Sequence, residues 1–348
     1  MKSSQVFIIG ATGYIGSTVM DLLLKESAKS GHTFRALVRS PEKAEDIRSI
    51  GIEPVFGSLD DTELLEKEAS HADIVLSFAN SDHLGSVQAI LKGLRHRPRL
   101  ENGRKRPILI HTSGTGVLLD EAYGNHGSQT IYYDNDIAQL STLGPQQPHR
   151  IVDLEIMSPT LKGQVDTYIV VPPAIWGFGT RPGSLSHNQV SIMVASSLKH
   201  KQAVQIGKGL NYWSKVHVVD LAVFYIHLFG RALKEPQDEI SNVGQGQVSL
   251  PKNEDAYYFV QEGDDFQWGE VAQEIAKHFQ QLAINDSGLV KGTSPEEEAV
   301  YWEPGMSGYL GGNSRSRAVK GKELLAWEPK YTDFKSYIYE EIQCQRRL

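Results

Sequence analysis

Three glycines spaced three residues apart are the first residues that predict a chemistry. The heptapeptide Gly10-Ala11-Thr12-Gly13-Tyr14-Ile15-Gly16 follows a short apolar stretch, 6–9, and leads into a segment with helical apolar spacing, 14–25. Glycine permits a tight turn and lets backbone N–H groups approach a pyrophosphate, and the start of a helix adds a favourable dipole. The pattern predicts a dinucleotide-binding loop formed by Gly10, Thr12, Gly13, Tyr14, Ile15 and Gly16. The alternative is that the glycines serve only the turn and its packing.

A basic residue follows the second expected strand, 33–38, where an NAD-specific site carries an acidic residue. That acidic residue holds the ribose 2′-hydroxyl, whereas a guanidinium can pair with a 2′-phosphate and stack on adenine. Arg39 therefore predicts NADP(H) as the cofactor, with Arg35 as a second candidate. Because Lys43 adds another basic residue here, Arg39 could instead be an exposed loop arginine without a ligand.

These residues need a scaffold in which several strands end side by side. Short apolar, β-branched segments alternate with helical ones over the first 112 residues, which is typical of a parallel sheet covered by helices on both faces. We expect strands at 6–9, 33–38, 52–56, 73–78 and 108–112, and helices at 14–25, 63–69 and 87–94. Five such steps predict an α/β fold, a Rossmann-type doubly wound parallel sheet.

The pattern changes after residue 114. Segment 114–148 has no periodicity and predicts a long functional loop. We expect helices again at 150–157, 192–198, 218–233 and 269–279, and strands at 167–171 and 257–261. Residues 1–175, completed by about 215–250, would form the cofactor-binding core. Residues 176–214 and 251–348 would form a smaller C-terminal substrate-binding lobe.

Several motifs resemble those of the extended and atypical short-chain dehydrogenase/reductase superfamily, in its epimerase-like and nitrogen-regulator-like branches. The resemblance covers most of the chain. The glycine loop matches the family's GxxGxxG, and 38–44 is similar to its NADP-reading segment. The family elements GDLxD, TSS, RPxxVYG, IHVxDxA and LGWxP are resembled, in that order, by 57–61, 111–114, 171–177, 216–222 and 325–329.

The resemblance implies roles for particular residues. Leu59 and Asp60 would lie beside the adenine, and Ala79 and Asn80, after the fourth strand, would border the ribose. Pro172 would pass the nicotinamide, and Ser113 would be the catalytic serine that polarises the substrate oxygen. For Ser113 the alternative is a turn residue at the end of a strand.

One family element is missing, the YxxxK motif on the helix after Ser113. In the family its tyrosine transfers a proton to or from the substrate oxygen, and its lysine lowers the tyrosine pKa. The corresponding residues here, 146–153, read QQPHRIVD. A replacement donor could be His149, which shares a helix face with Asp153, four residues on. Arg150 could take the electrostatic role of the lysine.

Tyr133, or Tyr132 beside it, is the other candidate donor if the long loop folds over the site. The alternatives are a helix-start ion pair between His149 and Asp153, and tyrosines that only pack. Gly305–Gly312, around Tyr309, predicts a flexible loop that could close over a substrate or form a surface turn.

Composition narrows the function classes further. The chain has 348 residues and a formal net charge of −7, which argues against general attraction to nucleic acid or to an anionic membrane. With Cys344 as the single cysteine and no compact ligand array among 12 histidines, we expect neither a disulfide nor a metal site. No apolar stretch is long enough for a signal peptide or a membrane span, so we expect a cytoplasmic protein. The resemblance also implies a homodimer.

The sequence thus predicts an NADPH-dependent reductase of a small, rather apolar carbonyl or enone compound. Ser113 would polarise the oxygen, and Tyr133 or His149 would be the non-standard proton donor. Two alternatives stay open. The absence of YxxxK would suit a non-catalytic regulator that senses NADP, and the same fold would suit a non-redox epimerase or dehydratase.

Overall fold

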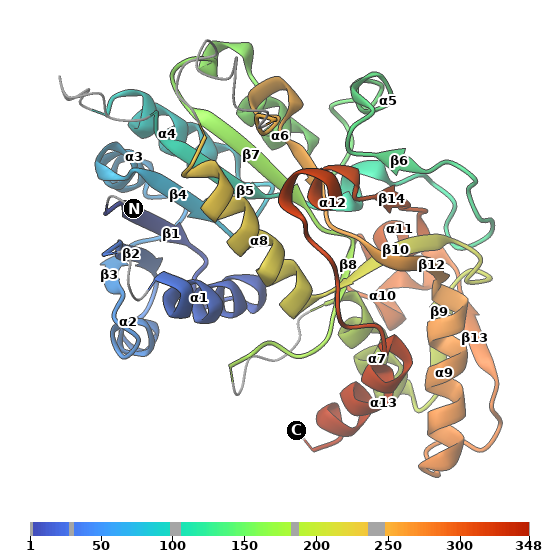
Figure 1. Cartoon of the computed structure of the whole chain (residues 1–348). Helices are drawn as coiled ribbons and strands as arrows, with labels where there is room; N and C mark the ends of the chain where they lie inside the picture. The colour runs from blue at the N-terminus through green and yellow to red at the C-terminus, as the bar shows by residue number, and fades with distance from the viewer. Residues whose placement is uncertain (1–2, 28–30, 98–105, 182–187, 236–247, 348) are drawn as a thin grey trace.

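Seven parallel strands form the central sheet of the computed structural model, which describes residues 3–27, 31–97, 106–181, 188–235 and 248–347 (Figure 1). In spatial order the strands are β11 (Tyr257–Phe259), β7 (Asp166–Val171), β5 (Ile108–Thr112), β4 (Ile74–Ser77), β1 (Gln5–Ile9), β2 (Thr33–Val38) and β3 (Glu53–Phe56). The chain builds outward from β1 to β3 and then returns to place β4 on the other side of β1. Ligands of doubly wound sheets bind at the carboxyl ends of the strands beside such a reversal. The predicted fold class is confirmed.

Helices cover both faces of this sheet. On one face α1 (Tyr14–Ser27) packs against α8 (Val218–Ala232), as Figure 1 shows. On the other face α4 (Leu84–Arg95) packs against both α3 (Thr62–His71) and α6 (Arg150–Ile156). Helix α2 (Pro41–Arg48) connects β2 to β3 and packs beside these two strands. Because β4, β5 and β7 are therefore buried on both sides, their sequences are largely apolar runs with little alternation, apart from Asp166 at the start of β7.

A smaller lobe contains its own apolar core. Its strands are β12 (Glu262–Gln267), β10 (Tyr212–His217) and β8 (Ala174–Trp176), in that order in one sheet, and β13 (Val290–Thr293) with β9 (Ala203–Ile206) in another. Its helices are α7 (Gln189–His200), α9 (Trp268–Gln281), α10 (Glu298–Tyr301), α11 (Met306–Gly311) and α13 (Phe334–Gln345). Trp213, Phe266 and Trp268 pack together at its centre, and each is at most 4% exposed.

Part of the chain that the sequence assigned to the lobe contributes to the core. Strand β11 pairs with β7 at the edge of the large sheet, and α12 (Val319–Leu325) packs against α8 and β11. Tyr257 and Trp327 accordingly belong to the main hydrophobic cluster. Apolar periodicity marks each of these elements, but it does not say which sheet the element joins. Residues 236–247, within the segment expected to complete the core, lie outside the described residues.

Segment 114–148 is better ordered than its composition predicts. It contains a 3-10 helix at Thr115–Leu118, a short strand β6 (Tyr132–Tyr133) and helix α5 (Ile137–Ser141). Strand β6 pairs in parallel with β14 (Ser316–Arg317), a segment more than 180 residues further along the chain. A tertiary partner therefore orders this segment, which has no periodic pattern of its own.

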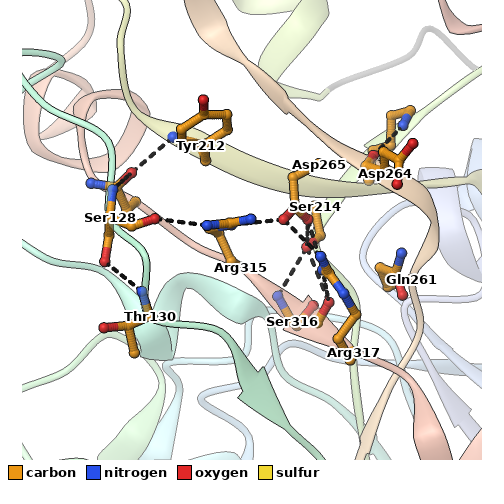
Figure 2. A network of polar contacts seen from close by, with 12 residues as sticks. Ser128, Thr130, Tyr212, Ser214, Gln261, Asp264, Asp265, Arg315, Ser316 and Arg317 are labelled. Carbon is orange, nitrogen blue, oxygen red and sulfur yellow. Dashed lines mark hydrogen bonds and ion pairs between the residues drawn. The ribbon is translucent and has the colours of Figure 1, made fainter.

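A carboxylate on β12 connects this segment to the lobe. The Asp265 side chain, 4% exposed, accepts hydrogen bonds from Arg315 over 2.7 Å, from Arg317 over 2.9 and 3.0 Å, and from Ser214 over 2.6 Å (Figure 2). Arg315 also donates to the Ser128 carbonyl over 2.8 Å. Burial alone would raise the pKa of Asp265, but the hydrogen bonds from Arg317, Ser214 and Arg315 outweigh it and lower that pKa. The ionised carboxylate thus joins β10, β12, β14 and the 114–148 segment.

Candidate active site

The glycine loop lies at the carboxyl end of β1. Gly10 has a φ of 83°, a conformation that favours glycine, and the Gly13 N–H donates to the Gly10 carbonyl over 3.1 Å. A Cβ on Gly16 would lie 2.1 Å from the Gly10 oxygen, and one on Gly10 would lie 2.9 Å from the Ala79 nitrogen. Both ends of the loop therefore exclude a side chain. Gly13 is exposed, and the loop ends at the N-terminus of α1, so its backbone fits a pyrophosphate.

Arg39 follows β2, at the carboxyl edge of the same sheet. Its side chain is exposed and forms no ion pair with any residue in the described ranges. Arg35 lies four residues earlier, on β2. Its guanidinium nitrogens lie 2.6 Å from a Glu53 carboxylate oxygen and 2.8 Å from a Glu68 carboxylate oxygen, so this guanidinium is already engaged. Of the two arginines, Arg39 is the one available to meet a 2′-phosphate.

The other residues expected near the cofactor follow β3 and β4 at this edge. Leu59 packs against the main core, and the exposed Asp60 carboxylate lies 3.1 Å from His83 Nε2. Ala79 is half-buried, and the Asn80 side-chain oxygen accepts the Asp82 N–H over 2.9 Å. The sheet topology thus brings these positions to the edge that also carries the glycine loop.

A cleft of about 450 Å³ opens next to the glycine loop and extends between core and lobe. Its lining combines apolar side chains with a few polar groups and comprises Tyr14, Ile15, Phe78, Ser81, Ser113, Gly114, His149, Pro172, Pro173, Ile175, Asn188, Gln189, Ile192, Met306 and Tyr309. Within the described part of the chain this lining contains neither a carboxylate nor a lysine or arginine. Such a cleft favours an uncharged ligand with apolar surface.

Ser113 begins a chain of buried hydrogen bonds that leads away from the cleft. Its hydroxyl donates to Asp153 Oδ2 over 2.9 Å, and the Tyr257 hydroxyl donates to the same oxygen over 2.6 Å. Arg150 in turn donates to the Tyr257 oxygen over 2.8 Å. Burial raises the pKa of Asp153 to about 6, while the bonds from Tyr257 and Ser113 oppose the increase. Burial likewise raises the pKa of Tyr257 well above its usual value, so Tyr257 stays a donor.

His149 is paired with Asp82, a residue from the β4–α4 connection. Its Nδ1 lies 2.9 Å from Asp82 Oδ1 and 3.0 Å from the Ser81 hydroxyl, and its backbone N–H donates to the same Asp82 oxygen over 3.0 Å. The hydrogen bond to His149 is the main reason why the pKa of Asp82 is lowered. The opposite ring nitrogen, Nε2, faces Gly114, where a Cβ would lie 3.2 Å from it. The imidazole is therefore fixed beside Ser113 with Nδ1 turned to a carboxylate.

The expected pairing of His149 with Asp153 is wrong. His149 is the N-cap of α6 and has a φ of 67°, outside the helical region. Its carbonyl accepts the Asp153 N–H over 3.0 Å, but its side chain does not follow the face of the helix. Asp153, completely buried, instead bonds Ser113 and Tyr257. Sequence spacing could not anticipate a left-handed residue at the first position of this helix.

Two further candidates lie away from the cleft lining. Tyr133 is 41% exposed on β6, where its backbone pairs with Arg317 of β14. Arg150 is 4% exposed, and besides Tyr257 it donates to the backbone carbonyls of Leu140 and Leu143. This geometry gives Tyr133 no support as a proton donor and places Arg150 in the packing between α5 and α6.

The comparisons with known proteins agree with this architecture. An NAD(P)H-binding family model matches residues 10–135. The oxidase ucsJ of Acremonium sp is 30% identical over 346 residues, which cover 94% of this chain and 93% of that protein. The chain belongs to the short-chain dehydrogenase/reductase superfamily. Isoflavone reductase homolog A622 of Nicotiana tabacum matches a shorter stretch of this chain. The two are 34% identical over 102 residues, which cover 27% of this chain and 32% of that protein.

Solved structures of other proteins share the fold of this chain over almost its whole length. A dTDP-glucose 4,6-dehydratase from Bacillus anthracis, in complex with NAD, has a TM-score of 0.65 and 18% identity, covering 99% of this chain and 97% of that one. A UDP-glucose 4-epimerase from Thermotoga maritima has a TM-score of 0.64 and 15% identity, covering 99% of each chain. The protein is an NAD(P)-dependent enzyme of the oxidoreductase type, and its cofactor is a nicotinamide dinucleotide.

The structure also shows residues of this superfamily member that the sequence did not single out. Asp82, Ser81 and Asn188 enter the site from connections whose positions follow from tertiary packing alone. Tyr309 lines the cleft from α11, so this part of the glycine-rich segment is helical. Its ring lies against Gly116, where a Cβ would be 3.0 Å away. The glycines around Tyr309 were the only signal that could have pointed to it.

Two absences also characterise the described residues. Within these ranges no three His, Cys, Asp or Glu side chains lie close enough together to hold a metal ion. Among the same residues, no helix has both the length and the apolar character needed to cross a membrane.

Proposed function

We propose that this enzyme is an NADPH-dependent reductase of a small, uncharged and rather apolar carbonyl or enone compound. The observation that supports this most strongly is the cleft beside the glycine loop, whose uncharged and largely apolar lining includes Ser113 and His149 among its few polar side chains. The reduced nicotinamide, when bound, supplies the hydride. The residues of the chain bind the substrate, orient its oxygen and provide the proton.

In this proposal His149 is the proton donor that replaces the missing tyrosine. The Asp82 carboxylate holds Nδ1 and stabilises the imidazolium, which leaves Nε2 to give its proton to the substrate oxygen. His111, two residues before Ser113, cannot serve at neutral pH because complete burial lowers its pKa to about 3. Ser113 hydrogen-bonds the same substrate oxygen, while Ile175, Ile192 and Met306 exclude water.

The preference for NADP(H) rests on Arg39, whose exposed guanidinium has no ion-pair partner among the described residues. An uncharged substrate follows from the lining, since a nucleotide-sugar diphosphate would need cationic side chains that the described part of the cleft does not supply.

The test is a panel of ketones, aldehydes and enones assayed with NADPH and with NADH, with product analysis. We expect NADPH consumption equal to the product formed for at least one apolar member, and at least a hundredfold loss of kcat in His149→Gln. Binding of NADP without turnover of any member would favour the regulatory alternative. Conversion of a substrate without net NADPH consumption would favour an epimerase or dehydratase.

A further inference from the structure

The carboxyl group of Asp153 touches Ser113 but has no role in the reaction proposed above. It is completely buried, it does not line the cleft, and its Oδ2 is the acceptor of the Ser113 hydroxyl at 2.9 Å. Its second oxygen, Oδ1, is also buried and has no hydrogen-bond partner among the described residues. A carboxylate in such a position loses hydration that is only partly replaced.

The charge of Asp153 decides which way the Ser113 hydroxyl points. A serine has one O–H to donate. While Asp153 is ionised, its carboxylate can only accept hydrogen bonds. The Ser113 hydroxyl therefore donates its hydrogen to Asp153 and directs its lone pairs toward the cleft. A carbonyl oxygen also carries only lone pairs and cannot bond to Ser113 in that state, whereas an alcohol can donate to it.

A protonated Asp153 reverses this arrangement. Its acid hydrogen can be donated to Ser113 Oγ, and the serine hydrogen is then free for a carbonyl oxygen in the cleft. The ionisable and polar groups around the carboxyl are Tyr257 from β11, Ser113 from β5, Arg150 from α6, and His149 from the cap of α6. The Tyr257 and Ser113 hydrogen bonds and the charge of Arg150 favour the ionised form, as does the imidazolium form of His149. Burial opposes them and has the larger effect, because the pKa of Asp153 is raised.

We propose that Asp153 is a positioning residue that must carry a proton for Ser113 to bind a carbonyl substrate. Its ionised form favours binding of the corresponding alcohol. The inference rests on the proposed function. The chemical balance of the reaction is unchanged by it: a hydride from the reduced nicotinamide and a proton from His149 convert C=O to CH–OH, and Asp153 keeps its own proton throughout.

The first test is the pH dependence of kcat/KM for carbonyl reduction between pH 5 and 8. In the wild type we expect kcat/KM to fall about tenfold per pH unit above the midpoint of the Asp153 titration. Over the same range the inhibition constant of the product alcohol should not rise. Asp153→Asn should remove this step and leave only the pH dependence that His149 contributes as proton donor, since an amide N–H can donate to Ser113 at every pH.

Tyr257→Phe gives an independent measurement. Loss of the 2.6 Å hydrogen bond destabilises the carboxylate, so the step should move to higher pH. Tyr258→Phe is the matched control, because Tyr258 is the adjacent buried tyrosine and its hydroxyl donates to the Pro251 carbonyl instead. It should leave the midpoint where it is in the wild type.

Infrared spectroscopy separates this inference from the proposed function. A buried carboxylic acid C=O stretch should titrate in the wild type, shift in Tyr257→Phe and be absent from Asp153→Asn. If no carbonyl compound is reduced, the proposed function fails, and the infrared titration still decides whether Asp153 carries the proton. The inference is overturned if no such band titrates, or if Asp153→Asn retains the wild-type pH step. Should Asp153→Asn not fold, the Tyr257→Phe shift decides.

Discussion

His149 Nδ1 lies 2.9 Å from Asp82 Oδ1, across 67 residues of sequence, and this contact fixes an imidazole that lines the cleft. The backbone N–H of His149 binds the same carboxylate oxygen, so one residue holds both the helix start and the ring. The helix that follows Ser113, which lacks the YxxxK motif, thus begins with an imidazole of fixed orientation.

The first prediction concerns this pair. His149→Gln should lower kcat for carbonyl reduction by at least about a hundredfold, because the proton donor is lost. The affinity for NADPH should be unchanged, because the glycine loop that binds the cofactor is intact. Asp82→Asn should lower kcat less, and most at higher pH, since the charge that stabilises the imidazolium is gone. Steady-state kinetics and calorimetry with NADPH measure both effects. His71→Gln, an exposed histidine on α3, is the control, and activity of His149→Gln within twofold of wild type would exclude the assigned role.

Cofactor choice gives a second prediction. Arg39→Ala should weaken NADP binding by about tenfold or more and leave NAD binding nearly unchanged, because the 2′-phosphate loses its cation. Arg35→Ala should alter neither affinity, since Arg35 is engaged with Glu53 and Glu68. Calorimetric titrations of both variants with NADP and with NAD give the ratio of the two affinities. An unchanged NADP to NAD ratio in Arg39→Ala would refute the assignment.

The glycine loop offers a third prediction with an internal control. A Cβ on Gly16 would lie 2.1 Å from the Gly10 oxygen, so Gly16→Ala should cost about 2 kcal/mol of unfolding free energy and abolish NADPH binding. A Cβ on Gly13 would lie 3.4 Å from the same oxygen, an ordinary contact, so Gly13→Ala should retain its stability. It should nevertheless bind NADPH more weakly if the exposed face of the loop carries the pyrophosphate. Urea denaturation and cofactor titration check the pair.

A fourth prediction concerns Asp265. Asp265→Asn leaves Arg315 and Arg317 without their carboxylate and should cost about 3 kcal/mol in urea denaturation. Because the pKa of Asp265 is lowered in the folded protein, its contribution is present above the ordinary value of 3.8 and is lost as the pH falls through the lower folded value. The wild type should therefore lose more stability on acidification than the variant does. Asp264→Asn, at the exposed neighbour, is the control and should behave as the wild type at every pH.

The sequence by itself determined the cofactor platform. Strand and helix periodicity, with the glycines at 10, 13 and 16, is local information, and parallel strands that end at one edge bring Arg39, Ser113 and Pro172 toward it. The α/β fold class, the position of the glycine loop and the resemblance to the superfamily all follow from such short-range patterns.

Only the tertiary structure decided the chemistry at that edge. Whether His149 meets Asp82 or Asp153 depends on one left-handed residue at the start of α6, which no apolar pattern encodes. Whether Asp153 meets Ser113 and Tyr257 depends on β11 joining the sheet beside β7, because the two partners are 40 and 104 residues away from Asp153 in sequence. Burial, which sets the pKa of Asp153, is likewise a property of the packed chain, since the same carboxyl would be solvated in an isolated helix.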